Sequence, residues 1–249
     1  MTLTCTQPTD LLASQALVAV QNDHAAWWLF DLQQPPVPPT VLHASLSPRE
    51  RARAASLTPK AAVRLTTSYG LLRHLLAQRL GLTARQVPLT ISPTGKPRLA
   101  SQPGIPSLGF NLSHSGHFMA IALSEHHEVG IDIEMLRERQ GREIIAERFF
   151  TTEERDWLSN TPDEKASAFQ RLWTAKEAYS KALGRGLGMP WNTFTLTPPP
   201  HAFVGAWQLN HPGQTAEEWS ITTVHHDAAA TIALALGSPT VSTPLGRTA

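Results

Sequence analysis

Three acidic residues stand out because apolar side chains flank them. Asp132 and Glu134 belong to GIDIE (130–134), and Glu177 belongs to RLWTAKEAYSK (171–181). Side chains two apart in a strand share one face, so a strand over 130–134 would present both carboxylates together. Neighbouring buried carboxylates repel each other, and a hard divalent cation such as Mg²⁺ relieves that repulsion. The pattern therefore favours a magnesium site.

The second segment adds cationic and aromatic groups around its glutamate. Trp173, Glu177 and Lys181 are four residues apart, so a helix would align them in one row. Lys176 would lie at the margin of that row. Such a face suits the binding of phosphate oxygens. A simpler interpretation stays open, in which the strand carboxylates end an edge strand in solvent and Glu177 with Lys181 forms a surface ion pair.

Capping residues and helical spacing predict the helices that would hold these groups. Ser47, Pro48 and Glu50 form a capping signal at the start of one segment, and glycines predict where helices end. The expected helices begin near Ser47, near Thr58 with an end at Gly81, near Thr151, and near residue 163 with an end at residue 183.

Short apolar runs between turn residues predict the strands. Two of them, 16–20 and 25–30, would form a hairpin, followed by a stiff proline-rich loop over 33–40. Residues 83–107 are expected to be rich in loops. Further strands are expected at 108–112, 117–123, 128–134, 193–196, 203–209, 219–224 and 230–236, with a hairpin that joins 117–123 to 128–134.

The order of these elements predicts an α+β fold. Helix pairs followed by hairpins occur in both halves, and the apolar runs 119–124 and 231–237 resemble each other. We therefore expect a pseudo-two-fold duplication, with each lobe an antiparallel sheet packed by a long helix. The expected parts are an N-terminal lobe over 1–124, a C-terminal lobe over 125–237 and a mobile tail over 238–249.

Composition excludes several classes of protein. Of 249 residues, 41% are hydrophobic and 16% are charged, which allows a sizeable core. The net charge of +1 argues against bulk attraction to nucleic acid or an anionic membrane. The single cysteine, Cys5, favours a reducing cytoplasm, and the sequence predicts neither a signal peptide nor a membrane-spanning segment. We expect a soluble cytoplasmic protein.

Three motifs together resemble the 4′-phosphopantetheinyl transferase superfamily. They are FNLSHSG (110–116), GIDIE (130–134) and RLWTAKEAYSKALGRGL (171–187), in the family's order. The length is similar to that of the Sfp-type branch, which has two similar halves in one chain. The resemblance implies a holo-[acyl-carrier-protein] synthase activity. Such an enzyme transfers 4′-phosphopantetheine from coenzyme A to a serine of an apo acyl or peptidyl carrier protein, depends on Mg²⁺ and releases 3′,5′-ADP.

The resemblance also implies catalytic roles for matched residues. Asp132, Glu134 and Glu177 would hold Mg²⁺ against the pyrophosphate of coenzyme A. Glu177 would in addition be the general base for the attacking serine, directly or through water. Lys181 would stabilise or protonate the departing phosphate, and with Glu177 and Asp132 it completes the expected catalytic set.

Other matched residues would bind coenzyme A. Ser113 and His114 match positions near its 3′-phosphate and adenine, although a hydrogen-bonded structural histidine is the alternative for His114. Lys96, in the TGKP loop, matches a lysine near the nucleotide, and Lys176 and Lys181 are expected phosphate contacts.

Basic residues on the first two expected helices would bind the 3′-phosphate. The family places such residues there, and this chain offers Arg51, Arg53 and Arg64. Ordinary solvated helix faces are the alternative, and Glu50 stands where some members have a basic residue.

Two other functions stay open. One is a Mg²⁺-dependent nucleotidyl or phosphoryl transferase that acts on another nucleotide, and the other is an inactive module that binds carrier proteins. The sequence contains neither a GxxxxGK[ST] loop nor a GxGxxG turn. Because the second half would replace a partner subunit of the shorter branch, we expect a monomer. Residues 137–150 are the candidates for docking the carrier protein.

Overall fold

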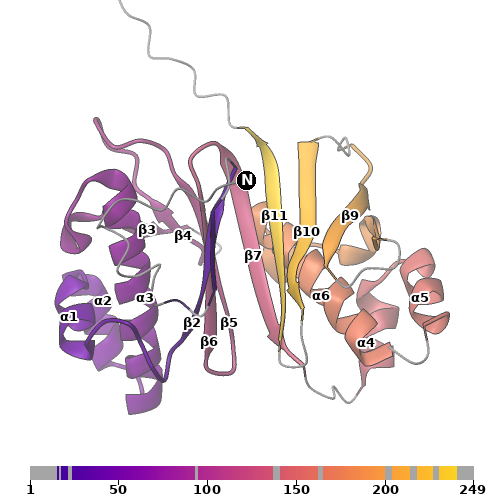
Figure 1. The fold of residues 1–249 in the computed structure, drawn as a ribbon, viewed down its shortest axis with the longest axis horizontal. Coiled ribbons are helices and arrows are strands. Elements are labelled where there is room, and N and C mark those ends of the chain that lie inside the picture. Colours follow the sequence, from indigo (N-terminus) through magenta and orange to yellow (C-terminus); the bar gives the residue numbers. More distant parts are fainter. Residues whose placement is uncertain are drawn as a thin grey trace, which may run out of the picture.

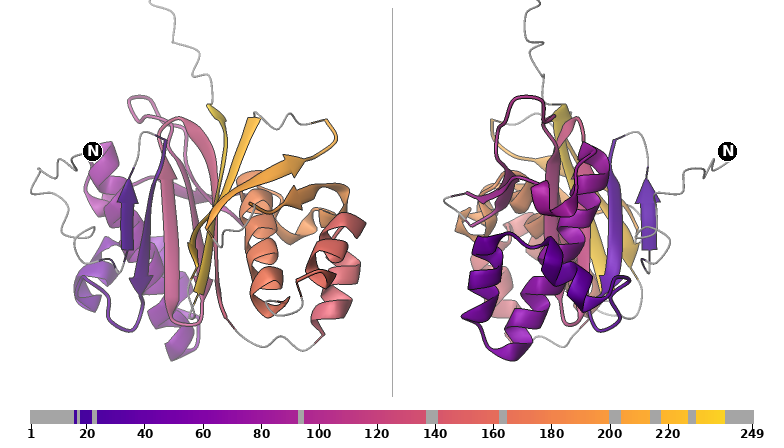
Figure 2. Two further views of the ribbon diagram at one scale, coloured as in Figure 1. Left: turned by 45° about the vertical axis from the view of Figure 1, so that its right-hand side comes forward. Right: turned by 90° about the vertical axis from the view of Figure 1, so that its left-hand side faces the viewer.

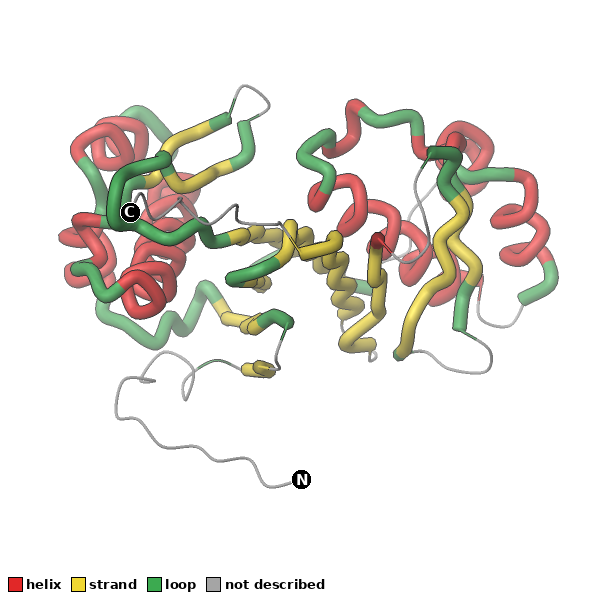
Figure 3. Tube along the Cα trace, turned by 90° about the horizontal axis from the view of Figure 1, so that it is seen from above, coloured by secondary structure: helices red, strands yellow, loops and turns green. Residues whose placement is uncertain are grey.

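Two α+β lobes stand side by side, with their sheets in the middle and their helices on the outside (Figure 1). This computed structural model describes residues 16, 18–21, 24–92, 95–136, 141–161, 165–199, 204–213, 218–226 and 230–239. Seen from above, strands separate two groups of helices (Figure 3). None of the described helices combines the length and apolar composition that a membrane crossing requires.

The N-terminal lobe is a four-stranded antiparallel sheet covered by helices on one side (Figure 2). Its strand order is β1 (Val18–Gln21), β2 (Ala26–Asp31), β6 (Phe118–Ser124) and β5 (Gly109–Ser115). The helices are α1 (Pro39–Ser45), α2 (Pro48–Ala55) and α3 (Pro59–Leu80). A two-stranded ladder joins β3 (Leu89–Ile91) to β4 (Pro97–Leu99).

Local signals explain where the helices of this lobe begin and end. Ser47 and Glu50 form a complete capping box at the start of α2. The long helix α3 has Pro59 in its first turn and ends at Gly81, whose φ of +64° is a left-handed conformation that glycine adopts without strain. The buried side of α3 then packs its leucines against Trp28, Phe30 and their neighbours on the sheet.

The C-terminal lobe is a five-stranded antiparallel sheet with its own helices. Its strand order is β7 (His127–Met135), β11 (Ala230–Pro239), β10 (Trp219–His226), β9 (Gly205–Asn210) and β8 (Thr195–Thr197). The helices are α4 (Arg142–Phe149), α5 (Thr152–Ser159) and α6 (Lys165–Ala182). An aromatic core that includes Phe150, Trp173 and Trp191 fills the space between α6 and this sheet.

A third core joins the two sheets back to back. Trp27 and Leu29 on β2 pack with Ile131 and Ile133 on β7, and alanines of β6 leave room for them. Adjacent strand residues point to opposite faces, which is why Trp28 belongs to the N-terminal core while Trp27 belongs to this interface. The lobes therefore share a continuous apolar contact.

The α+β fold class and most expected elements are confirmed, but four expectations need correction. The strand over 117–123 does not form a hairpin with 128–134, because β6 pairs with β5 and β2 whereas β7 pairs with β11. Helix α1 occupies part of the expected proline-rich loop, and the β3–β4 ladder was not expected. Ser238 and Pro239 belong to β11 rather than to a tail, and 240–249 lie outside the described residues. The division into domains at residue 124 stays a prediction.

Candidate active site

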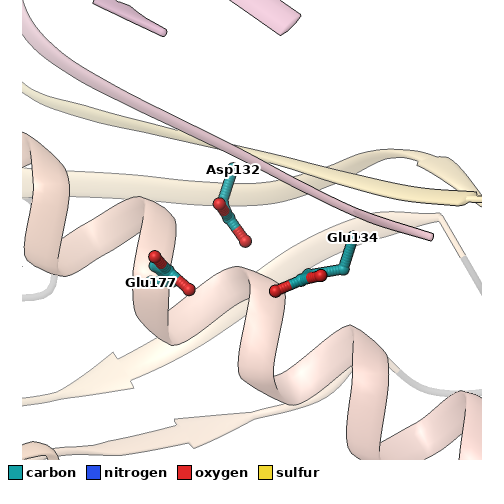
Figure 4. A group of neighbouring side chains, drawn as sticks. All are labelled: Asp132, Glu134 and Glu177. Carbon is teal, nitrogen blue, oxygen red and sulfur yellow. The ribbon is translucent and has the colours of Figure 1, made fainter. Parts of the chain in front are cut away.

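The three acidic residues singled out in the sequence lie together between β7 and α6. Asp132, Glu134 and Glu177 each offer a carboxylate oxygen, and these oxygens all lie within 4.8 Å of one another. Figure 4 shows the two strand carboxylates and the helix carboxylate pointing toward one another. The alternation predicted for GIDIE is confirmed, since Ile131 and Ile133 face the opposite core.

Gly130 permits the close approach of helix and strand on which this cluster depends. A Cβ atom added at Gly130 would lie 2.0 Å from the carbonyl oxygen of Ala178 and 2.4 Å from the amide nitrogen of Ala182. Both contacts are with backbone, which cannot move aside as a flexible side chain can. Only glycine therefore lets α6 lie against β7 at the distance that brings Glu177 to Asp132.

Asp132 is a buried carboxylate with one oxygen paired and one oxygen free of hydrogen bonds. Its Oδ1 accepts hydrogen bonds from the Lys181 ammonium at 2.6 Å and from the Ser113 hydroxyl at 2.7 Å. Its Oδ2 is buried and has no hydrogen-bond partner among the described residues. Burial raises the pKa of Asp132 to about 7, although Lys181 opposes this shift; Glu177 adds to it. An unsatisfied buried carboxylate oxygen beside two other carboxylates fits a divalent cation.

Lys181 is the cation of the cluster. Besides Asp132, its ammonium group donates to the Ser113 hydroxyl at 2.8 Å and lies 3.5 Å from Glu177 Oε1. Burial lowers the pKa of Lys181, but the charges of Asp132 and Glu177 outweigh burial and raise it above its usual value. Lys181 therefore stays protonated at neutral pH. The cluster therefore combines three carboxyl groups with one ammonium group.

Side chains of β5, the edge strand of the other lobe, hold β7 in place. Asn111 Oδ1 accepts a hydrogen bond from the Ile131 amide at 3.0 Å, and the Ser115 hydroxyl accepts one from the Met135 amide at 2.9 Å. Ser115 also donates to Glu134 Oε2 at 3.2 Å. These contacts cover the exposed edge of β7 without a backbone ladder, and they fix both carboxylates of the strand relative to the N-terminal lobe.

The other face of β5 carries His114. Its Nε2 lies 2.7 Å from the hydroxyl of Ser68 on α3. Burial lowers the pKa of His114 to about 4, and the nearby charges of Arg64 and Lys181 act in the same direction. The imidazole is therefore neutral at pH 7. Ser113 and His114 stay predictions as ligands of coenzyme A, but only Ser113 touches the carboxylate cluster.

Lys96 lies beside the cluster and is held by backbone carbonyl groups. Its ammonium donates to the carbonyl oxygens of Lys181 at 2.9 Å and Val129 at 3.4 Å. Burial lowers the pKa of Lys96 to about 8. A hollow of about 240 Å³ next to it is bordered by residues of both lobes, among them Asn111 and Lys181. The hollow therefore reaches Lys181, the residue that contacts Asp132 and Glu177.

The expected phosphate contact of Lys176 is wrong. Its side chain is 0% exposed, and its ammonium donates to both carboxylate oxygens of Glu154 at 2.6 Å and to the Phe194 carbonyl at 2.8 Å. Trp173 is also buried, and its ring contacts Phe149, Phe169 and Trp191 in the C-terminal core. Of the expected helical face, only Glu177 and Lys181 reach the site.

The three expected arginines of α2 and α3 lie in different environments. Arg51 donates to the carbonyl of Leu46 at the turn before its own helix. Arg53 and Arg64 are exposed, with Arg53 hydrogen-bonded to Tyr69 and Arg64 close enough to affect His114. The departure at Glu50 has a structural reason, because its carboxylate binds buried Arg73 at 2.7 and 3.1 Å. The assignment of these arginines to a phosphate stays a prediction.

Sequence reasoning missed several residues that support the site. Asn111 and Ser115 alternate with Ser113 in FNLSHSG, so the two-residue period of polar side chains was a usable signal. Gln170, whose amide reaches the backbone of β7, gave no signal in the sequence.

Comparison with known proteins identifies relatives for both lobes. Sequence models of two families match, "4′-phosphopantetheinyl transferase, N-terminal" over residues 40–126 and "4′-phosphopantetheinyl transferase superfamily" over residues 128–235. The chain is 36% identical to 4′-phosphopantetheinyl transferase HetI of Nostoc sp. over 203 residues, which cover 80% of this chain and 82% of HetI.

Other relatives match over shorter stretches. Identity is 37% over 127 residues with 4′-phosphopantetheinyl transferase gsp of Aneurinibacillus migulanus, or 51% of this chain and 50% of that protein. It is 33% over 127 residues with 4′-phosphopantetheinyl transferase Sfp of Bacillus subtilis, or 51% and 54%. The match therefore spans about half the length of these two relatives.

Proposed function

Because the chain belongs to the 4′-phosphopantetheinyl transferase superfamily, we propose that it transfers 4′-phosphopantetheine from coenzyme A to a serine of an apo carrier protein. The reaction would require Mg²⁺ and release 3′,5′-ADP. The observation that carries this proposal is the meeting of three carboxylates and one lysine beside a hollow between the lobes.

The residues present fit a magnesium ion. Asp132, Glu134 and Glu177 supply carboxylate oxygens, which hard divalent cations prefer, and Asp132 Oδ2 is buried without a hydrogen-bond partner in the described part of the chain. These three residues would hold the ion, which when bound would act as a Lewis acid on the pyrophosphate.

Glu177 would accept the proton in this reaction, and Lys181 would stabilise the leaving group. In the reaction the serine oxygen bonds to the phosphorus that carries pantetheine, and the phosphoanhydride bond to 3′,5′-ADP breaks. The serine proton would go to Glu177, directly or through water, since the side chain of this residue is 17% exposed. Lys181, protonated because of its carboxylate neighbours, would stabilise the charge of the departing phosphate.

The N-terminal lobe would bind the nucleotide end of coenzyme A. Arg53 and Arg64 are exposed cations, Arg64 is close enough to affect His114 on β5, and a guanidinium binds a phosphate in two-point geometry. Neutral His114 would serve as a hydrogen-bonding group rather than a charge. Lys96 borders the hollow beside Lys181 and would contact the nucleotide there.

We also propose a cytoplasmic monomer, because one chain supplies both walls of the cleft. The carrier protein would dock near α4, where Ile144 is 70% exposed and Leu136 at the end of β7 is 39% exposed. Residues 137–140 of the expected docking segment lie outside the described residues.

Intact mass spectrometry of a carrier protein tests the proposed function. The protein is incubated with coenzyme A, Mg²⁺ and an apo carrier domain, and a matched carrier with its serine changed to alanine serves as the control. We expect a phosphopantetheine-sized mass increase on the serine-containing carrier alone, lost on chelation of Mg²⁺. Nucleotide turnover without carrier modification would instead support a different transferase, and binding without either would support an inactive module.

A further inference from the structure

Helix α6 lies antiparallel to β7 and is attached to it at two levels. Gly130 touches Ala178 and Ala182 at one level, and Gln170 reaches Glu134 at the other. Four residues of strand cover about 13 Å, and the eight residues of helix from 170 to 178 cover about 12 Å. The two lengths match, so the attachments bracket the segment of α6 that carries Glu177.

The Gln170 attachment joins three elements through one buried amide. Its Nε2 donates to the Glu134 carbonyl oxygen at 2.7 Å and to the Thr231 hydroxyl at 3.1 Å. Thr231 lies directly opposite Glu134 in the β7–β11 ladder, and both Gln170 and Thr231 are buried. The amide therefore fixes the end of β7, its cross-strand neighbour and α6 relative to one another.

We propose that Gln170 is a positioning residue that fixes the backbone of Glu134 and so sets the distance between the strand carboxylates and Glu177. This inference rests on the proposed function, in which all three carboxylates hold a divalent cation. Besides the ladder to β11, the Glu134 end of β7 is held by Ser115, which bonds to Glu134 at 3.2 Å and to the Met135 amide at 2.9 Å, and by Gln170 at 2.7 Å. Loss of a group that orients a metal ligand typically weakens metal binding 10- to 100-fold.

Mn²⁺ binding measures this role without any transfer reaction. Gln170→Met keeps the length of the side chain but removes the amide donor. We expect it to weaken binding of Mn²⁺ alone about tenfold by isothermal titration calorimetry or electron paramagnetic resonance. In the transfer assay the Mg²⁺ concentration for half-maximal rate should rise similarly, while the KM for coenzyme A at saturating Mg²⁺ changes less than about twofold.

Thr174→Val is the matched control. Thr174 is buried on the same helix, and its hydroxyl donates within the helix to the Gln170 carbonyl at 2.7 Å. This variant removes one buried hydrogen bond from α6 without removing a contact to β7, so it should lower thermal stability but leave Mn²⁺ affinity within about twofold of the unmodified chain. Thr231→Val should have a smaller effect than Gln170→Met, because the bond to Glu134 remains.

The outcomes separate the positioning role from the proposed function. Transfer and Mn²⁺ binding by the unmodified chain, with unchanged affinity in folded Gln170→Met, would overturn the role of Gln170 alone. Equal weakening by Thr174→Val would do the same, since any destabilisation of α6 would then suffice. An unmodified chain with neither transfer nor Mn²⁺ binding would overturn the proposed function and this role with it. If Gln170→Met does not fold, Gln170→Asn, which is too short to reach Glu134, gives the same comparison.

Discussion

The two edge strands that face each other between the lobes carry different chemistry. β7, backed by α6, presents Asp132 and Glu134, and the helix adds Glu177. β5, in the other lobe, presents amide and hydroxyl groups toward β7 and places His114 against α3 on its far face. Lys181, from α6, bonds to both strands, because it donates to Asp132 and to Ser113.

This difference between β5 and β7 shows that facing strands of similar sheets can suit ligands of opposite charge. In the proposed function, the acidic wall formed by Asp132, Glu134 and Glu177 would hold a cation, whereas the neutral wall formed by β5, with the exposed Arg64 near His114, would accept a phosphate. A diphosphate that carries a divalent cation needs both walls at once. Substitutions on each wall therefore test this division of roles.

Of the substitutions on the acidic wall, Glu177→Gln should reduce the transfer rate most. The substitution keeps the size of the side chain but removes a charge and a base, so transfer should fall on the order of 10³-fold. Coenzyme A affinity and the circular dichroism spectrum should stay unchanged. Glu128→Gln, an exposed position on the same strand, serves as the control and should transfer normally. A loss of the folded state in Glu177→Gln would mean that the residue is structural.

Gly130→Ala should change the geometry of the acidic wall, because it alters the packing of α6 against β7. The added methyl group would meet backbone of α6 at 2.0 Å, so helix and strand must separate. We expect a loss of about 2 kcal/mol in the free energy of unfolding, together with weaker Mn²⁺ binding. Gly188→Ala is the matched control, because an added Cβ there meets nothing within 4 Å. Equal stability of the two variants in urea denaturation would contradict the close approach.

Arg64→Ala and Arg53→Ala test the neutral wall and its arginines. If either guanidinium binds the 3′-phosphate, the KM for coenzyme A should rise about tenfold with little change in kcat. The same variants should use dephospho-coenzyme A, which lacks that phosphate, as well as the unmodified chain does. Arg79→Ala, farther along α3 and paired with Glu125 at 3.8 Å, is the control. Unchanged KM values for coenzyme A would overturn the arginine assignment.

The acidic wall was largely predictable from the sequence because its geometry is local. The two-residue period of a strand places Asp132 with Glu134, and the four-residue spacing of a helix places Glu177 with Lys181. Lys176 was assigned wrongly because helical spacing gives an angle around the axis but not the width of the face that packs inward. Its burial depends on Glu154, which lies 22 residues away.

Long-range pairing explains the other failures. Gln170 reaches partners 36 and 61 residues away, and no sequence pattern joins such positions. The polar turn expected over EHHE (125–128) indicated a reversal of the chain, but it could not tell whether the returning strand would pair with β6. In the structure β7 crosses to the second sheet, because its apolar side packs into the core shared by the two lobes.

The smallest predicted effect concerns the pH dependence of stability, because burial shifts the pKa of one group on each wall. Burial favours the uncharged form of both groups, so it raises the pKa of Asp132 to about 7 and lowers that of His114 to about 4. Between pH 6.5 and 4 the unfolded chain binds a proton at His114 that the folded chain does not. The free energy of unfolding therefore decreases as the pH is lowered through this range.

His114→Gln should reduce this pH dependence, because glutamine does not titrate. We expect the difference in stability between the unmodified chain and the variant to shrink by about 1 kcal/mol from pH 7 to pH 5, allowing for solvent around a partly exposed ring. Urea denaturation at both pH values measures the difference, in which contributions of the other histidines and of Asp132 cancel. Parallel stability curves would mean that folding does not lower the pKa of His114, and would contradict its burial in a neutral form.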